Sequence, residues 1–233
     1  KYYKDHPEYF ALRDGRREDH PFAQLCLSNP EVLEIATQKA LEDLRAHPDC
    51  AIISISQNDG LQPCQCEACR KIVEEEGSES GPIIRFVNKV AEAIEKEFPH
   101  VWVDTLAYDY SRKPPKHVRP RRNVIVRLCT FECCFTHPLA ECPEIADTKW
   151  PHVDPIFRDF AGDLKRWAEI SEKLFIWDYV TDFEFYCNIH PNLHVLKPNM
   201  KLFAENKVQG VFPQGNGQSH SGEMAELRAY LLA

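Results

Sequence analysis

The sequence predicts an α/β fold of the (β/α)8 TIM-barrel type, with about six of the eight strands carried by this chain. Segments typical of strands and of helices alternate along the chain, a pattern that favours a parallel sheet. Polar residues follow nearly every predicted strand, as they do at the mouth of a barrel. Neither G-x-G-x-x-G nor G-x-x-x-x-G-K-[ST] occurs, so the sequence does not favour an open nucleotide-binding sheet.

In the first half of the chain, two short apolar segments predict strands at 24–29 and 51–56. The letters SNPE at 28–31 give a capping residue, a proline for the first helical position and an acid for the first turn. A helix therefore begins there, and His47-Pro48 ends it. The run Ala51–Ile55 predicts a buried strand. Two further helices are expected at about 66–76 and 83–98, the second with one apolar face.

From residue 101 onward, four more strands are expected, and a helix separates each of the last three from the next. The Pro- and Arg-rich segment 111–122 joins the first two of these strands and carries no helix signal. A long loop is predicted over 130–153. The predicted strands lie at 101–108, 123–129, 174–180 and 208–214, and the helices lie at about 154–172, 198–206 and 222–233.

Composition favours one substantial domain over residues 1–233, because 43% of the residues are hydrophobic. No apolar run reaches the roughly 18 residues of a membrane span. The formal net charge of −8, without a concentrated basic face, does not favour a nucleic-acid partner. The chain opens on KYYKDHPEYF, which is typical of the middle of a domain, so we expect the missing barrel strands and any leader upstream.

The residues that follow the predicted strands combine carboxylates, amides and aromatic rings, which is the set that a sugar site needs. Glycoside hydrolysis also needs two carboxyls, and the catalytic candidates are Asp59, Glu132 and Asp178. The chain is therefore predicted to hydrolyse a poly- or oligosaccharide without a cofactor. The residues expected to bind the substrate are Gln57, Asn58, Tyr108, Arg127, His137, Tyr179, Gln214 and Asn216.

Each catalytic candidate also has a plainer interpretation. Asp59 precedes Gly60 and suits a turn, and Glu132 suits a solvated loop. Asp178 stands in the apolar context IWDYV, where a buried acid needs either a partner or a function. The alternative hypothesis is accordingly a non-catalytic carbohydrate-binding or scaffold domain on the same barrel.

Three of the ten cysteines form the pattern C-x-C-x-x-C at Cys64, Cys66 and Cys69. This spacing suits zinc, and Cys26 on the preceding predicted strand is a fourth donor by barrel adjacency. We expect such a zinc to be structural. Unmetallated thiols or one local disulfide are the alternative. A zinc-stabilised hydrolase of another substrate is the third functional hypothesis, and a thiol nucleophile at Cys133 or Cys134 is a weaker one.

Several motifs together resemble a known family along nearly the whole chain. They are HPEYFAL, QLCLSNPEV, SISQND followed by CQCEAC, DTLAY, NVIVRLC-x-x-ECCF, IWDYV, FAEN and QGNGQS. The sequence is similar to the bacterial domain-of-unknown-function family 4838. The resemblance implies a glycoside-hydrolase-like TIM barrel, often part of a large secreted or surface protein. It also implies a layout like that of family 20 hexosaminidases and family 67 α-glucuronidases.

The hexosaminidase layout places an adjacent Asp-Glu pair after the fourth strand, and Asn58-Asp59 occupies that place here. The amide at Asn58 argues against hydrolysis assisted by a substrate N-acetyl group. The resemblance leaves Asp59 as general acid, with Glu132 or Asp178 as its partner. Arg127 would suit a substrate carboxylate, as in an α-glucuronidase, because a guanidinium pairs with a carboxylate through two hydrogen bonds.

Overall fold

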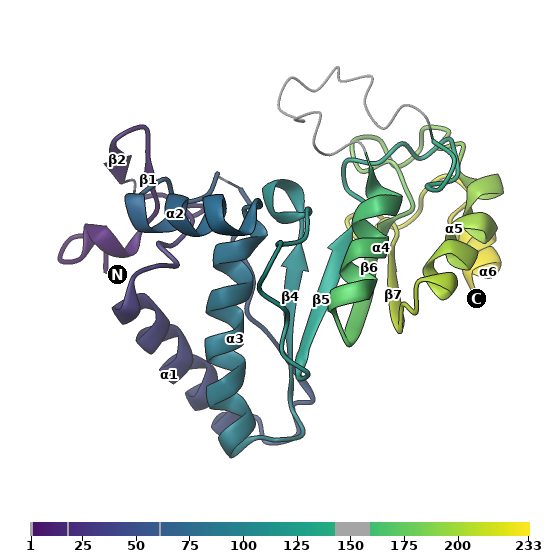
Figure 1. The fold of residues 1–233 in the computed structure, drawn as a ribbon. Coiled ribbons are helices and arrows are strands. Elements are labelled where there is room, and N and C mark those ends of the chain that lie inside the picture. The colour runs from purple at the N-terminus through teal and green to yellow at the C-terminus, as the bar shows by residue number, and fades with distance from the viewer. Residues whose placement is uncertain (1, 18, 61, 143–158) are drawn as a thin grey trace. The chain divides into compact units, whose positions relative to one another are not determined.

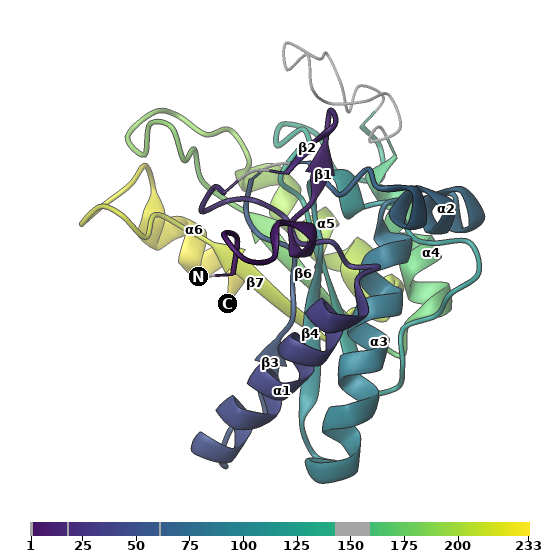
Figure 2. The ribbon, with the colours of Figure 1, turned by 90° about the vertical axis from the view of Figure 1, so that its left-hand side faces the viewer.

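The computed structural model describes residues 2–17, 19–60, 62–142 and 159–233. Its main sheet has the strand order β3-β4-β5-β6-β7, and β3 pairs with β4, and β6 with β7, in parallel. This order follows the chain without the reversal of a doubly wound sheet, which confirms the predicted fold class. The strands are β3 (Ile52–Ser54), β4 (Trp102–Ala107), β5 (Val124–Cys129), β6 (Lys173–Tyr179) and β7 (Gly210–Gln214) (Figure 1, with β3 labelled in Figure 2).

The chain forms two compact units. The first comprises residues 1–126 and 170–173, and the second comprises 127–169 and 174–233, so that β5 contributes to both. The smaller elements of the first unit are η1 (Pro7–Tyr9), an antiparallel pair of β1 (Leu12–Arg13) and β2 (Arg16–Arg17), and η2 (Asp109–Ser111). The helices are α1 (Pro30–Ala46), α2 (Glu67–Glu76), α3 (Ser80–Glu97), α4 (Phe160–Ile170), α5 (Leu193–Glu205) and α6 (Ala225–Leu232).

Helix α1 begins where the capping signal predicts. The Asn29 side-chain oxygen accepts hydrogen bonds from the backbone N–H groups of Glu31 (2.9 Å) and Val32 (3.4 Å), which satisfies two of the helix's free donors. Pro30 occupies the first turn, where its missing N–H costs nothing. The helix lies beside α3, as Figures 1 and 2 both show.

Helix α3 carries the apolar face that the sequence predicts, and residues such as Val87, Ala91 and Ile94 are almost fully buried. It begins at Ser80, three residues before the expected start. Gly77 ends α2 in the left-handed conformation (φ +63°), which favours glycine. At Gly81 an added Cβ would lie 2.6 Å from the Glu76 Cβ, so glycine is needed for the close approach of the two helices.

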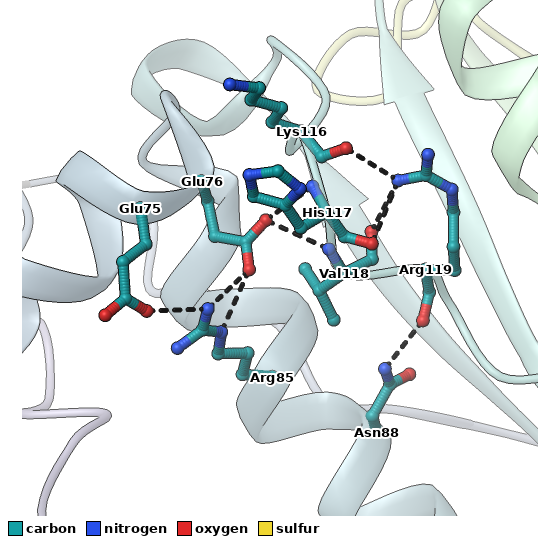
Figure 3. A network of polar contacts seen from close by, with 8 residues as sticks. All are labelled: Glu75, Glu76, Arg85, Asn88, Lys116, His117, Val118 and Arg119. Carbon is teal, nitrogen blue, oxygen red and sulfur yellow. Dashed lines mark hydrogen bonds and ion pairs between the residues drawn. The ribbon is translucent and has the colours of Figure 1, made fainter.

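The segment that joins β4 to β5 is held by a buried carboxylate. Figure 3 shows Glu76, at the end of α2, between the Arg85 guanidinium and the backbone of the joining segment. Its carboxylate accepts hydrogen bonds from Arg85 Nη2 (2.6 Å) and from the N–H groups of His117 (2.8 Å) and Val118 (2.9 Å). Burial acts to raise the pKa of Glu76, but the hydrogen bonds outweigh it and the pKa is lowered. The Glu76 carboxylate thus fixes this connection, whose residues include no α-helix between β4 and β5.

Three sequence expectations differ from the structure. Residues 24–29 form an isolated antiparallel bridge between Leu25 and Phe10 instead of a strand of the main sheet. β3 is partly exposed rather than buried, with Ile52 42% exposed, because it is an end strand and pairs only with β4. α5 starts at Leu193, earlier than expected, and accommodates Pro198 inside the helix.

Part of the predicted loop 130–153 and the first residues of the predicted helix 154–172 lie outside the described residues. From Phe160 onward the expected helix is present as α4, which buries Phe160, Leu164 and Trp167 completely. None of the helices in the described part of the chain has both the length and the apolarity that crossing a membrane requires.

Candidate functional site

The two amides that follow β3 bind the protein's own loops. Gln57 Nε2 donates to the Tyr108 carbonyl at 3.2 Å, and Gln57 Oε1 lies 2.5 Å from the Ser111 hydroxyl. Asn58 Nδ2 donates to the Ala23 carbonyl at 2.5 Å. Both residues were predicted to bind substrate. In the structure the Gln57 amide joins the end of β3 to η2, and the Asn58 amide joins it to the segment that contains Ala23.

Two carboxyls of the first unit lie near each other, after neighbouring strands. Asp59, after β3, is exposed, and its Oδ1 lies 3.4 Å from the Tyr108 hydroxyl, which donates to it. Asp109, directly after Tyr108, is half-buried. Burial raises the pKa of Asp109, and the negative charge of Asp59 raises it further. The two acids therefore have unlike environments, which is the condition for giving them different chemical roles.

The backbone at Asp109 adopts an unusual conformation, with φ +49°. A positive φ is uncommon for a residue other than glycine, although Asp and Asn tolerate it better than most. Hydrogen bonds hold it there: the Tyr108 N–H donates to Ser111 Oγ at 3.1 Å, and Ser111 is fully buried. Such strained positions cluster at functional sites. Sequence reasoning placed Asp109 after a strand but gave it no role, and that position was the signal available.

A cavity of about 240 Å³ lies in the first unit. Its lining includes Gln57 and Asn58 from the end of β3, together with Glu79, Tyr110 and Phe86. Burial raises the pKa of Glu79. Burial also raises the pKa of Tyr110, and the charges of Asp109 and Glu79 add to that shift. Glu79 and Tyr110 thus line this cavity, whereas Asp59 and Asp109 are not among its lining residues.

In the second unit, aromatic rings gather around the end of β6. The rings of Trp177 and Tyr179 are stacked, with centroids 6.2 Å apart and an interplanar angle of 12°. Phe212 meets Trp177 edge-on at 5.2 Å, and Phe131 meets Tyr179 in the same way at 5.6 Å. Gln214 Oε1 accepts a hydrogen bond from Trp177 Nε1 at 2.5 Å. Flat rings of this kind suit the apolar face of a pyranose.

Asp178 belongs to the opposite face of β6. It is 4% exposed and alternates with Trp177 and Tyr179, whose side chains point the other way. The Thr130 hydroxyl donates to Asp178 Oδ1 at 2.9 Å and accepts from the Tyr179 N–H at 3.1 Å. Burial raises the pKa of Asp178 to about 6. The acid thereby fixes Thr130, which directly precedes Phe131 and the half-buried Glu132.

The other predicted substrate-binding residues of the second unit each contact a different group of side chains. The Arg127 guanidinium lies over the Phe175 ring, 5.7 Å from its centroid. Asn216 Nδ2 donates to the Ser219 hydroxyl at 3.3 Å. His137 lies with two thiols: its Nδ1 is 3.2 Å from Cys134 Sγ and 3.9 Å from Cys142 Sγ. His137 and these two thiols form a group that could hold a metal ion, whereas the predicted contact of His137 with a sugar stays a prediction.

Comparison with known proteins decides the family. The family described as "Domain of unknown function (DUF4838)" matches residues 1–233, the whole chain. The chain belongs to this family. No curated protein matches the DUF4838 chain. Solved structures that resemble it include "Endo-glycoceramidase II from Rhodococcus sp.: Lactosyl-Enzyme Intermediate", at 11% sequence identity and a TM-score of 0.44, covering 87% of this chain. The chain spans 45% of that protein's length.

The DUF4838 chain also brings together the four predicted metal ligands. The sulfur atoms of Cys26, Cys64, Cys66 and Cys69 all lie within 4.8 Å of one another, and none of these cysteines is in a disulfide. Three groups of side chains thus stand out in the structure: acids and amides after β3 and β4, aromatic rings around the end of β6, and a cluster of four thiols. The first group can transfer protons, the second can pack on sugars, and the third can bind a soft metal ion.

Proposed function

We propose that this chain is a glycoside hydrolase in which Asp59 and Asp109 are the two reacting carboxyls. The observation that carries the proposal is the pair of neighbouring acids with unlike environments, one exposed and hydrogen-bonded by Tyr108, the other half-buried and with a raised pKa. Aromatic rings on β6 and β7 support a saccharide as the substrate class.

Asp109 supplies the proton in this proposal, in place of Asp59, which the sequence suggests as general acid, because the pKa of Asp109 is raised. It protonates the glycosidic oxygen as the bond from that oxygen to the anomeric carbon breaks, and the leaving sugar departs as an alcohol. Water provides the hydroxyl that the anomeric carbon gains, and its second proton returns to a carboxylate. Asp59 acts either as nucleophile or as the base that activates the water. A carboxyl separation of about 5 Å favours the first role and about 6.5–9.5 Å favours the second.

The roles of the other predicted acids follow from their contacts. Asp178 is proposed as a positioning residue, because its carboxylate holds Thr130 and lies on the face of β6 opposite Trp177. Glu132, the other predicted catalytic carboxyl, belongs to the second unit and is half-buried in the turn that follows β5. The proposed chemistry uses protein carboxyls and water alone, without a cofactor.

The test is a hydrolysis screen on plant, algal and host glycans, with each of Asp59 and Asp109 replaced by Asn. Asn tolerates a positive φ nearly as well as Asp, so Asp109→Asn should keep its backbone. Asp49→Asn is the matched control, because Asp49 is exposed in the turn before β3, at the other end of the same strand. We expect product from at least one glycan and a loss of about 100-fold or more in both site variants. Full activity in both would contradict the assignment.

A second candidate function is saccharide binding without turnover. It is favoured by the aromatic rings of Trp177, Tyr179 and Phe212, which can pack on a sugar without any reacting carboxyl. The same glycan panel separates the two candidates when binding is measured beside product release. Binding that depends on Trp177, with no product from any glycan, would support this candidate and contradict the hydrolase.

A further inference from the structure

We infer that Cys26, Cys64, Cys66 and Cys69 form a tetrathiolate site for a single zinc ion, which braces the first unit. The four sulfur atoms lie within 4.8 Å of one another, although Cys26 stands 38 residues before Cys64 in the chain. Cys26, Cys64 and Cys69 are buried, and Cys66 is half-buried. This inference is independent of the proposed hydrolysis.

The spacing of the sulfur atoms suits one metal ion. A tetrahedral zinc with Zn–S bonds of about 2.3 Å places its sulfur ligands about 3.8 Å apart. Cys26 Sγ and Cys66 Sγ lie 3.6 Å apart, far beyond the roughly 2.05 Å of a disulfide bond. Four soft ligands in a tetrahedral arrangement select zinc or iron over magnesium and calcium.

The surroundings of the sulfur atoms stabilise thiolates. The Leu12 N–H donates to Cys64 Sγ at 3.2 Å, and the Ser28 hydroxyl lies 3.4 Å from Cys26 Sγ and 3.5 Å from Cys66 Sγ. Cys66 occupies the N-cap position of α2 and Cys69 lies in its first turn, where the positive end of the helix dipole favours negative charge. Metal sites need such outer hydrogen bonds to orient their ligands.

The closeness of the four thiols also favours a cation among them. Four adjacent thiols cannot all ionise without a cation, because each new thiolate repels the others. A divalent metal removes that repulsion by binding all four.

The site would connect three segments of the first unit that lie apart in the sequence. Cys26 lies in the turn before α1, Cys64 and Cys66 lie in the loop before α2, and Leu12 belongs to the β1–β2 pair. Gln65 N–H donates to the Leu12 carbonyl at 2.7 Å, so the backbone already links two of these segments. Because the protein supplies all four ligands, we assign the metal a structural role.

Metal content of the chain purified without added metal tests the inference. We expect about one zinc per chain, and less than about a tenth of that in Cys26→Ser and Cys66→Ser. Cys50→Ser is the matched control, since Cys50 belongs to the same unit but bonds to the Ile52 carbonyl. Cys134→Ser should also retain the zinc. Metal-free protein, one iron in place of zinc, or zinc that is lost with Cys134→Ser would each overturn the inference.

A second measurement uses the unaltered chain, in case the serine variants fail to fold. Co²⁺ exchanged into the site should give the charge-transfer and ligand-field absorption of tetrahedral thiolate coordination. A mercurial reagent should then release the metal as it titrates four protected thiols among the ten. Octahedral cobalt spectra, or ten thiols that react at once without metal release, would contradict the site.

Discussion

The two compact units use the same kinds of side chain differently. In the first unit, the predicted site residues turn toward their own chain: the Asn58 and Gln57 amides bind backbone carbonyls, and four thiols form one buried cluster. In the second unit, the comparable groups are more open. Aromatic rings around β6 are partly exposed, and the group of Cys134, His137 and Cys142 is half-buried or exposed.

The difference shows that one residue type can serve stability in one place and recognition in another. A closed group of four thiols fills the coordination of a metal ion, whereas three ligands leave a position open. A buried acid such as Asp178 fixes a neighbouring hydroxyl, whereas Asp109 is only half-buried and lies beside the exposed Asp59. Burial and satisfied hydrogen bonds therefore distinguish residues that hold the structure in place from residues that are candidates for catalysis.

Removing the proposed zinc should cause the largest change, and only in the first unit. Structural zinc contributes on the order of 10 kcal/mol of binding free energy in small domains, so chelation should unfold the first unit at a much lower denaturant concentration. Hydrogen exchange measured with and without chelator should show lost protection at α1 and α2. Equal loss in both units would contradict a local brace.

Glu76→Gln should destabilise the first unit by about 3 kcal/mol, because it leaves the Arg85 guanidinium without its buried carboxylate partner. Glu75→Gln is the control, since Glu75 is exposed and also contacts Arg85. Its expected cost is below about 1 kcal/mol. Denaturant unfolding of the two variants gives the comparison, and similar losses would refute the support role of Glu76.

Asp178→Asn should stabilise the second unit, and more so at higher pH. The folded pKa of about 6 exceeds the usual 3.8, so the folded state holds its proton more tightly than the unfolded chain. Stability is thus greatest below pH 4 and falls as pH rises through about 6, by about 3 kcal/mol in all. Unfolding measured from pH 4 to pH 8 should show this slope in the unaltered chain and a weaker one in the variant. An unchanged slope would contradict it.

Trp177→Ala should weaken saccharide binding by about tenfold, which is about 1.4 kcal/mol, through loss of the stacked ring. Phe185→Ala is the control, because Phe185 is 57% exposed in the same unit. Isothermal titration with a saccharide that the unaltered chain binds provides the measurement. Equal affinity in both variants would contradict the proposed role of the Trp177 ring in saccharide binding.

The smallest expected effect concerns Cys134. Burial acts to raise its pKa, but hydrogen bonds with Thr136 and His137 lower it to about 7. Alkylation of Cys134 should therefore rise with a midpoint near pH 7, and His137→Ala should shift that midpoint upward. Peptide mapping after timed alkylation follows this one thiol. A midpoint near the ordinary cysteine value in the unaltered chain would contradict the prediction.

Sequence patterns could predict most helices and strands here, because periodicity and caps act over a few residues. The capping sequence before α1 is an example, since the Asn29 side chain accepts the hydrogen bond that a capping residue is expected to accept. Pairing partners are less accessible: the apolar letters at 24–29 gave no sign that Leu25 would bridge to Phe10. In IWDYV the neighbours of Asp178 are all apolar, so the sequence could not show on which face of the strand its side chain would lie. Cys26 lies beside the C-x-C-x-x-C motif as predicted, but the barrel adjacency behind that prediction was wrong, because residues 24–29 form no strand of the main sheet.

The role of Asp109 as the acid is tested most directly by varying the leaving group. On a natural glycoside that the unaltered chain hydrolyses, Asp109→Asn should lower kcat/KM by about 100-fold or more. On an aryl glycoside of the same sugar whose phenol leaves without protonation, the same variant should lose little activity, while Asp59→Asn should lose activity on both. Equal losses of Asp109→Asn on the two substrates, or no loss on either, would contradict the account.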